Sequence, residues 1–172
     1  MMNIMKRYLF IGAVLLIAGT ISAQNKYIGA EKCKACHNGT DHGNQYDSWL
    51  KDSHSQAIKT LSSEKAVEYA KKNGIADASK EAKCLKCHST YDAVAPELRD
   101  GIKQDESVSC EGCHGAGSRY RSPAIMKNHS LAVRSGLIEQ DEKLCLVCHN
   151  SEAPFHKEFD FKTAFEKVLH TK

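Results

Sequence analysis

The chain has 172 residues, of which 41% are hydrophobic and 26% are charged, and its formal net charge is +3. This length is sufficient for one domain, and the charge is too small and too dispersed to suggest a nucleic-acid partner. Large apolar residues are scarce beyond the N-terminus, so the chain would have difficulty building a core from its own side chains.

The N-terminus has the pattern of a secretory signal peptide. Lys6 and Arg7 precede an apolar run over residues 8–18, and small residues follow up to Ala23. The run is too short to cross a membrane comfortably, although an uncleaved N-terminal anchor is an alternative. We expect residues 1–23 to be removed and residues 24–172 to form one domain in the bacterial periplasm, without a stable membrane anchor. Loss of the leader lowers the net charge to about +1.

Helical periodicity dominates the first half of the mature chain. Residues 45–61 place Trp49, His54 and Ile58 on one side of a predicted helix. A second helix is predicted over residues 63–72, where Ser63 can cap the first turn, and a third over residues 80–88.

The second half alternates between loops and shorter helices. Residues 91–108 read as a loop, and a short helix beginning at Ser122 and Pro123 leads to His129. Residues 137–148 look helical, and Asp160 can cap a final helix that ends near His170. Because no segment alternates convincingly as a strand does, we predict a mainly helical fold with long loops.

One motif occurs four times and uses all eight cysteines. In each copy two cysteines frame two residues, and histidine follows at once. The copies are Cys33-Lys-Ala-Cys36-His37, Cys84-Leu-Lys-Cys87-His88, Cys110-Glu-Gly-Cys113-His114 and Cys145-Leu-Val-Cys148-His149.

This spacing is typical of covalent attachment of a c-type haem. Each thiol forms a thioether with a vinyl group, and the adjacent histidine can reach the iron. Structural zinc or disulfides would also use paired cysteines, but neither explains why histidine follows every pair. The sequence therefore predicts four haem c groups, whose apolar faces supply the missing core. We expect the apoprotein to be largely unfolded.

The ligand on the opposite face of each iron decides what the haem can do, because a second histidine gives a closed electron carrier and an empty face can bind a small molecule. His54, His170 and His129 are the leading candidates for this distal position. His42 and His156 lie in loops, where solvent exposure is the simpler interpretation. Met126 is the single methionine after the leader, so at most one site can be His/Met.

The chain resembles the tetrahaem cytochromes of the c-554 type. The resemblance rests on the Trp49–His54 spacing, on Cys110-Glu-Gly-Cys-His-Gly-Ala-Gly117, on the downstream His129 and on the terminal helix ending at His170. It implies a compact helical fold with stacked haem pairs. It also implies the axial pairs His37 with His129, His114 with His54 and His149 with His170, and a five-coordinate haem on His88.

Electron transfer is the function that these features favour, because four haems in so short a chain must lie close together. We expect redox partners such as a membrane quinol oxidase or a periplasmic oxidoreductase. The alternative is a reductase of nitric oxide, nitrite or hydroxylamine at an open His88 haem, with Tyr91 or Asp92 as proton donors. A third interpretation is a polymer in which a histidine of one subunit completes a haem in the next, so the oligomeric state is open.

Overall fold

The computed structural model describes residues 24–170, except for the side chain of His42. The predicted leader, residues 1–23, lies outside the described residues. The elements in chain order are α1 (Ala30–His37), η1 (Thr40–His42), α2 (Gln45–Lys51), η2 (Ser53–Gln56), α3 (Ala57–Thr60), α4 (Glu64–Lys72), α5 (Ala82–His88), α6 (Thr90–Ala93), η3 (Pro96–Leu98), η4 (Gln104–Glu106), α7 (Cys110–His114), α8 (Pro123–Met126), α9 (His129–Arg134), α10 (Glu142–Leu146) and α11 (Phe161–Val168).

The prediction of a mainly helical fold is confirmed. Within residues 24–170 the extended pairing is limited to an isolated bridge between Tyr27 and Arg99. None of the helices in this range is long and apolar enough to span a membrane.

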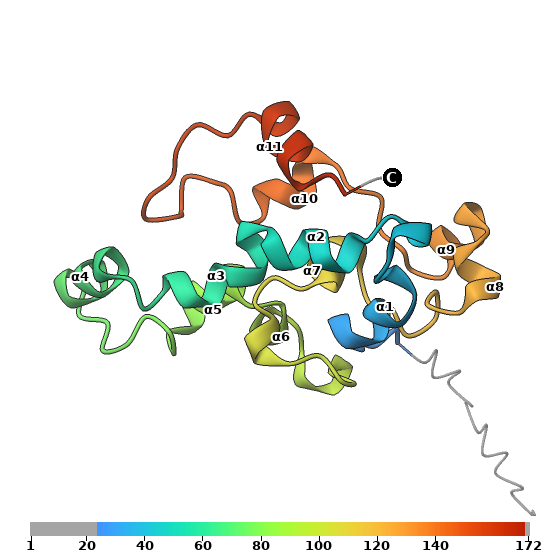
Figure 1. The fold of residues 1–172 in the computed structure, drawn as a ribbon. Helices are drawn as coiled ribbons and strands as arrows, with labels where there is room; N and C mark the ends of the chain where they lie inside the picture. The colour runs from blue at the N-terminus through green and yellow to red at the C-terminus, as the bar shows by residue number, and fades with distance from the viewer. Residues whose placement is uncertain (1–23, 171–172) are drawn as a thin grey trace, which may run out of the picture.

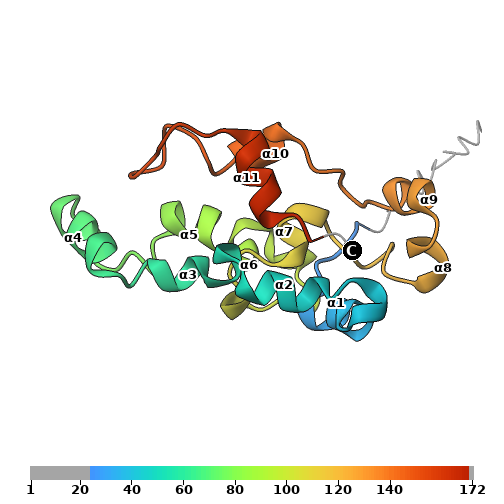
Figure 2. The ribbon, with the colours of Figure 1, turned by 45° about the horizontal axis from the view of Figure 1, so that its top comes forward.

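The short helices form an elongated body with the C-terminal segment on one side (Figure 1). α1, α2 and α3 follow one another along the middle, α4 lies at one end, and α8 and α9 lie at the other. Figure 2 shows the same order from a second direction, with α10 and α11 on one side of the body and the end of α11 descending towards α7.

The helix predicted over residues 45–61 is broken at Asp52. The backbone of Asp52 is extended, with φ −79° and ψ 150°, and the Asp52 side chain accepts a hydrogen bond from the backbone N–H of His54 at 2.8 Å. Aspartate favours such local turns because its carboxylate competes with helical hydrogen bonds. The chain therefore continues as η2 and α3 in a new direction, which changes where His54 points.

Side-chain caps begin the helices where the sequence predicts them. Ser63 Oγ accepts from the backbone N–H of Ala66 at 3.3 Å at the start of α4, and Asp160 Oδ1 accepts from Thr163 N at 2.8 Å at the start of α11. The predicted helices over residues 63–72 and near the C-terminus are therefore confirmed. α5 begins at Ala82, two residues later than predicted.

Two predictions for the second half need correction. Residues 137–141 are not helical, because Ile138 donates its backbone N–H to His114 O at 3.0 Å and Asp141 caps α10 instead. Residues 91–108 contain short helical turns rather than only loop. α9 begins at His129, where the sequence predicted the end of a helix.

Apolar burial by the polypeptide is modest. One cluster joins α3, α4 and α5 through Leu61, Ala70, Ala78 and Leu85, beside Cys84 of the second motif. Other buried apolar residues in the described part are scattered along the chain: Ile28, Ala30, Tyr46, Ile102, Tyr120 and Ala132.

Candidate haem-binding sites

Each Cys-x-x-Cys-His motif lies on or directly after a short helix. Three motifs end α1, α5 and α7, and the fourth overlaps the end of α10. A separation of three residues puts both thiols on the same helix face, and the histidine follows one turn after the first cysteine. None of the eight cysteines, all in the described range, is in a disulfide.

The motifs meet in two pairs. Cys110 of the third motif hydrogen-bonds to Cys33 of the first and lowers the pKa of the Cys33 thiol. Burial, followed by a hydrogen bond with Cys87 of the second motif, raises the pKa of Cys148 of the fourth to about 12. The structure therefore brings the first motif against the third and the second against the fourth.

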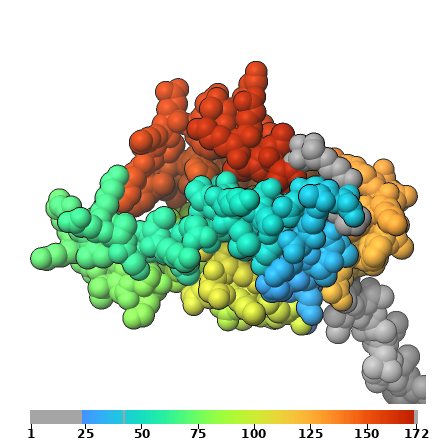
Figure 3. Space-filling model, in the orientation of Figure 1, coloured from blue at the N-terminus to red at the C-terminus, as the bar shows by residue number. Residues whose placement is uncertain are grey.

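His54 faces the histidine of the fourth motif. The ring centroids of His54 and His149 lie 6.0 Å apart, with the ring planes at 86°. Figure 3 shows the C-terminal segment arching over α2 and α3 with a hollow beneath it. Metal–imidazole bonds are about 2.0–2.1 Å long, so this separation leaves room for one metal ion bonded to both rings.

His170 faces the histidine of the third motif in a similar way. Its ring centroid lies 6.0 Å from that of His114, with the planes at 67°. Burial, and then the neighbouring His170 and His37, lower the pKa of His114 to about 4. The neutral imidazole that results is the form that binds a metal.

These two ring pairs differ from the axial pairing that the resemblance implied. His54 was expected with His114, and His170 with His149, but the structure places each beside the other's partner. The break at Asp52 turns His54 towards the fourth motif, and α11 brings His170 back to α7. Both exchanges depend on the path of the chain, which the motif spacing does not contain.

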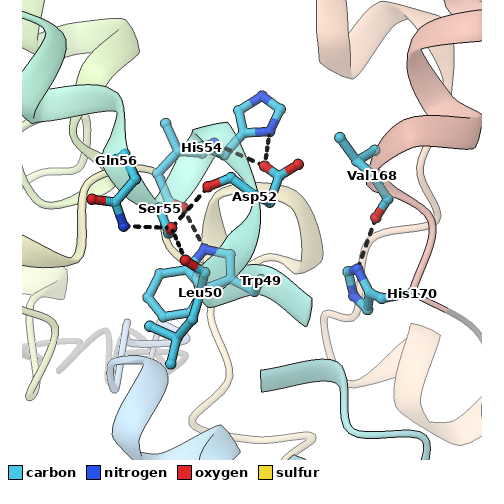
Figure 4. A network of polar contacts seen from close by, with 9 residues as sticks. Trp49, Leu50, Asp52, His54, Ser55, Gln56, Val168 and His170 are labelled. Carbon is cyan, nitrogen blue, oxygen red and sulfur yellow. Dashed lines mark hydrogen bonds and ion pairs between the residues drawn. The ribbon is translucent and has the colours of Figure 1, made fainter. Parts of the chain in front are cut away.

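One ring nitrogen, Nδ1, has a hydrogen-bond partner in both His54 and His170. His170 Nδ1 lies 2.8 Å from Val168 O, and His54 Nδ1 lies 2.8 Å from Asp52 Oδ1 (Figure 4). Metal-binding histidines commonly use one nitrogen in this way, which fixes the ring and leaves the other nitrogen for the metal.

The motif histidines His37 and His88 follow the same rule, because an oxygen atom lies beside Nδ1, whereas the neighbour of His114 Nδ1 is an amide nitrogen. His37 Nδ1 lies 3.2 Å from Gln45 Oε1, and His88 Nδ1 lies 2.7 Å from Ala57 O. The side-chain amide of Gln140 is 3.2 Å from His114 Nδ1. His149 is held differently, by stacking on Phe159 with centroids 4.9 Å apart and planes at 19°.

Two of the remaining candidate histidines, His129 and His156, are exposed. His129 is exposed at the start of α9, and its Nε2 lies 3.5 Å from Glu139 Oε1. His156 is exposed. Burial lowers the pKa of His149, and the neighbouring His54 and then His156 lower this pKa further. The side chain of His42 lies outside the described residues.

The two candidate proton donors near the second motif already have partners. The guanidinium of Arg99 lies over the Tyr91 ring, 4.1 Å from its centroid. Asp92 Oδ2 accepts a hydrogen bond from Gln104 Nε2 at 2.8 Å. These contacts tie both residues to the neighbouring turns.

Glu111, between the cysteines of the third motif, is 2% exposed. Its carboxylate accepts hydrogen bonds from the backbone N–H groups of Ile28 at 2.9 Å, Gly29 at 2.8 Å and Gly117 at 2.7 Å. It therefore fastens the segment before the first motif to the third motif.

Sequence reasoning assigned no role to several of these supporting residues. Asp52 could have been found from its position two residues before His54, where aspartate often forms a turn. Glu111 lies inside a recognised motif, but only the fold shows that the distant N–H groups of Ile28 and Gly29 converge on it together with that of Gly117. Gln45, Gln140 and Phe159 carry no sequence signal of their own.

Taken together, these residues fit a haem group at each motif. Free thiol pairs lie beside the motif histidines, of which His37 and His88 have an oxygen acceptor at Nδ1 and His149 stacks on Phe159. Two motif histidines each face a second imidazole across a gap that accommodates one metal ion.

Comparison with known proteins agrees with this geometry. Residues 32–115 match the family described as cytochrome c554 and c-prime. The fold is similar to that of reduced cytochrome c554 from Nitrosomonas europaea, with a TM-score of 0.55 and 20% sequence identity over 86% of this chain and 80% of that one. A search of curated protein sequences finds no match.

Proposed function

We propose that this chain, which belongs to the cytochrome c554 family, is an exported electron carrier that holds four haem c groups. Its family membership makes it an electron-transfer cytochrome with covalently bound haem. The number four rests on the four complete motifs, and export rests on the leader pattern in residues 1–23.

Each haem would be attached by the two cysteines of its motif and bound by the adjacent histidine. His54 would complete the site of His149, and His170 that of His114. His129 remains our candidate for the site of His37, which it could reach by leaving Glu139. When bound, haem supplies one-electron redox chemistry.

The observation that carries the proposal is the pair of imidazole contacts between distant segments. His54 and His149 are 95 positions apart in sequence, and His114 and His170 are 56 apart, yet each pair has its centroids 6.0 Å apart. A structural histidine pair would not require both Nδ1 atoms of the distal rings to be held, whereas a closed six-coordinate haem benefits from it.

The two motif contacts support rapid transfer within the molecule. Cys33 lies against Cys110 and Cys87 against Cys148, so the groups attached to them would be close neighbours. We propose that electrons arrive from, and leave to, separate proteins such as a membrane quinol oxidase or a periplasmic oxidoreductase.

The test is expression of the full chain in a bacterium that attaches haem in its periplasm. Mass spectrometry of the periplasmic protein should show loss of residues 1–23 and a mass increase of four haems. Cys145→Ser with Cys148→Ser should remove one haem from this count. Fewer than four haems in the wild-type chain, or retention in the cytoplasm, would contradict the proposal.

A second candidate function is reduction of a small nitrogen compound at the His88 site. This function is favoured by the surroundings of His88, which differ from those of the other motif histidines. His88 Nδ1 contacts Ala57 O and Thr60 Oγ1, and the apolar cluster that contains Leu61 and Leu85 lies beside the second motif. Electron paramagnetic resonance of the oxidised holoprotein should then contain a high-spin signal that nitric oxide abolishes. A spectrum with low-spin signals alone would exclude this function.

A further inference from the structure

Asp52 holds His54 in a way that distinguishes this histidine from the others. A single oxygen, Oδ1, accepts hydrogen bonds from both the backbone N–H and the ring Nδ1 of His54, each at 2.8 Å (Figure 4). Both side chains are largely withdrawn from solvent, with 20% of the Asp52 and 33% of the His54 side chain exposed. The interaction is therefore less screened than a surface ion pair.

The turn that presents Asp52 is fixed on both sides. Ser55 Oγ donates to Asp52 O at 2.8 Å, and Trp49 Nε1 donates to Val108 O at 2.9 Å. Val108 N also donates to His54 O at 3.1 Å. These bonds join the turn to the segment that precedes the third motif, so the carboxylate is preorganised towards the ring.

The other anchored histidines use uncharged partners. Val168 O and Ala57 O are backbone carbonyls, and Gln45 and Gln140 contribute side-chain amides. Glu139 near His129 is the next carboxylate beside a histidine in the described part of the chain, but it is 3.5 Å away and 68% exposed. Asp52 is thus the closest and best shielded carboxylate partner of a described histidine.

We propose that Asp52 lowers the reduction potential of the haem held between His54 and His149 and makes it the lowest of the four. This inference rests on the proposed function, since it requires His54 to bind the iron. A carboxylate that accepts the Nδ1 proton makes the imidazole more electron-rich. The oxidised iron carries one more positive charge than the reduced iron, so such a ligand stabilises the oxidised state.

The ordering has a consequence for the path of electrons. The haem of the fourth motif would be the last to accept an electron and the first to lose one. Because Cys148 lies against Cys87, the haem of the fourth motif would pass its electron most directly to the haem of the second motif. Asp52 would therefore act as a positioning residue that sets the direction of electron transfer within the protein.

The test uses Asp52→Asn in the full, haem-loaded chain. Asparagine caps a turn about as well as aspartate and retains a neutral acceptor, so the fold and the ligand should survive. Potentiometric titration followed by electron paramagnetic resonance assigns a reduction potential to each low-spin signal. The haem whose potential is lowest in the wild-type protein should become easier to reduce. We expect its redox equilibrium to shift about tenfold, equivalent to about 59 mV for one electron.

Asp47→Asn is the matched control, because it removes the same charge from the neighbouring helix α2. It should move the same signal much less than Asp52→Asn does. Equal shifts in the two variants, a new high-spin haem in Asp52→Asn, or an affected signal that is not the lowest in the wild type would each overturn the inference.

His54→Ala separates this inference from the proposed function. It should convert one low-spin haem to high spin. If it does so while Asp52→Asn matches the control, the role of Asp52 is refuted and His54 remains a ligand. If His54→Ala leaves every haem low-spin, the axial assignment of His54 is wrong and the inference falls with it.

Discussion

Replacing Glu111 with glutamine should destabilise the holoprotein by about 2–3 kcal/mol. In the wild-type chain Oε1 accepts from Ile28 N and Gly117 N, and Oε2 accepts from Gly29 N. A glutamine oxygen can replace Oε1, but the amide NH2 then faces the N–H of Gly29. A buried donor without a partner costs about 1–3 kcal/mol, and the two remaining bonds lose their charge assistance. The lower cost of burying a neutral amide offsets part of this loss.

Urea unfolding of the purified holoprotein, followed by far-ultraviolet circular dichroism, measures the change in unfolding free energy. For a chain of this size, the loss corresponds to a fall in Tm of roughly 5–10 °C. Glu97→Gln serves as the control, because Glu97 is exposed on η3 and should change stability by no more than about 0.5 kcal/mol. A loss of stability in Glu111→Gln as small as that in the control would show that the three hydrogen bonds do not fasten the first motif to the third.

Two further predictions concern the neighbourhood of the same motif. In Gly112→Ala the new Cβ would lie 2.7 Å from Thr90 Oγ1 and 3.1 Å from Val108 Cγ1. We therefore expect the unfolding free energy to fall by about 1–3 kcal/mol, and to fall less when the same change is made in a Thr90→Ala background. Equal losses in both backgrounds would refute the steric explanation. Burial raises the pKa of Glu106, which accepts from Ala30 N at 2.9 Å. A raised folded-state pKa favours the folded protein most below the unfolded value of about 4.3, and this contribution is lost as pH rises through the folded pKa. Glu106→Gln should therefore flatten part of the decline in urea midpoint as pH increases from mildly acidic values, and an unchanged slope would show that Glu106 does not titrate in this range.

The sequence predicted the features that depend on local chemistry. Ser63 and Asp160 cap their helices because a short polar side chain before a periodic segment can reach the second or third N–H of the helix. The helical pattern over residues 80–88 predicted the helix that carries the second motif. These signals lie within a few residues of one another, so no knowledge of the distant chain is needed.

Features set by hydrogen bonds that compete with the helical pattern were missed or assigned differently. The break at Asp52 comes from a side-chain hydrogen bond that outcompetes helix continuation, although the apolar spacing over residues 45–61 favours an unbroken helix. The shorter α10 follows from the bond between Ile138 N and His114 O, which draws residues 137–141 towards the third motif. Periodicity cannot report this second contact, because Ile138 and His114 are 24 positions apart.

The exchange of His54 and His170 between motifs links the two halves of the chain. His54 lies before the third and fourth motifs yet faces the fourth, and His170 follows all four yet faces the third. In the proposed arrangement, the fourth motif would take its distal ligand from an earlier part of the chain, and the third would take its ligand from the last described residue, His170. A chain that ended before α11 could still attach four haems by their cysteines, since attachment needs only the motifs. Its third haem would lack the imidazole of His170 and would be open to small molecules. With the axial ligands that we propose, the C-terminal helix would decide whether the third haem is a closed electron carrier, just as the turn at Asp52 would for the fourth.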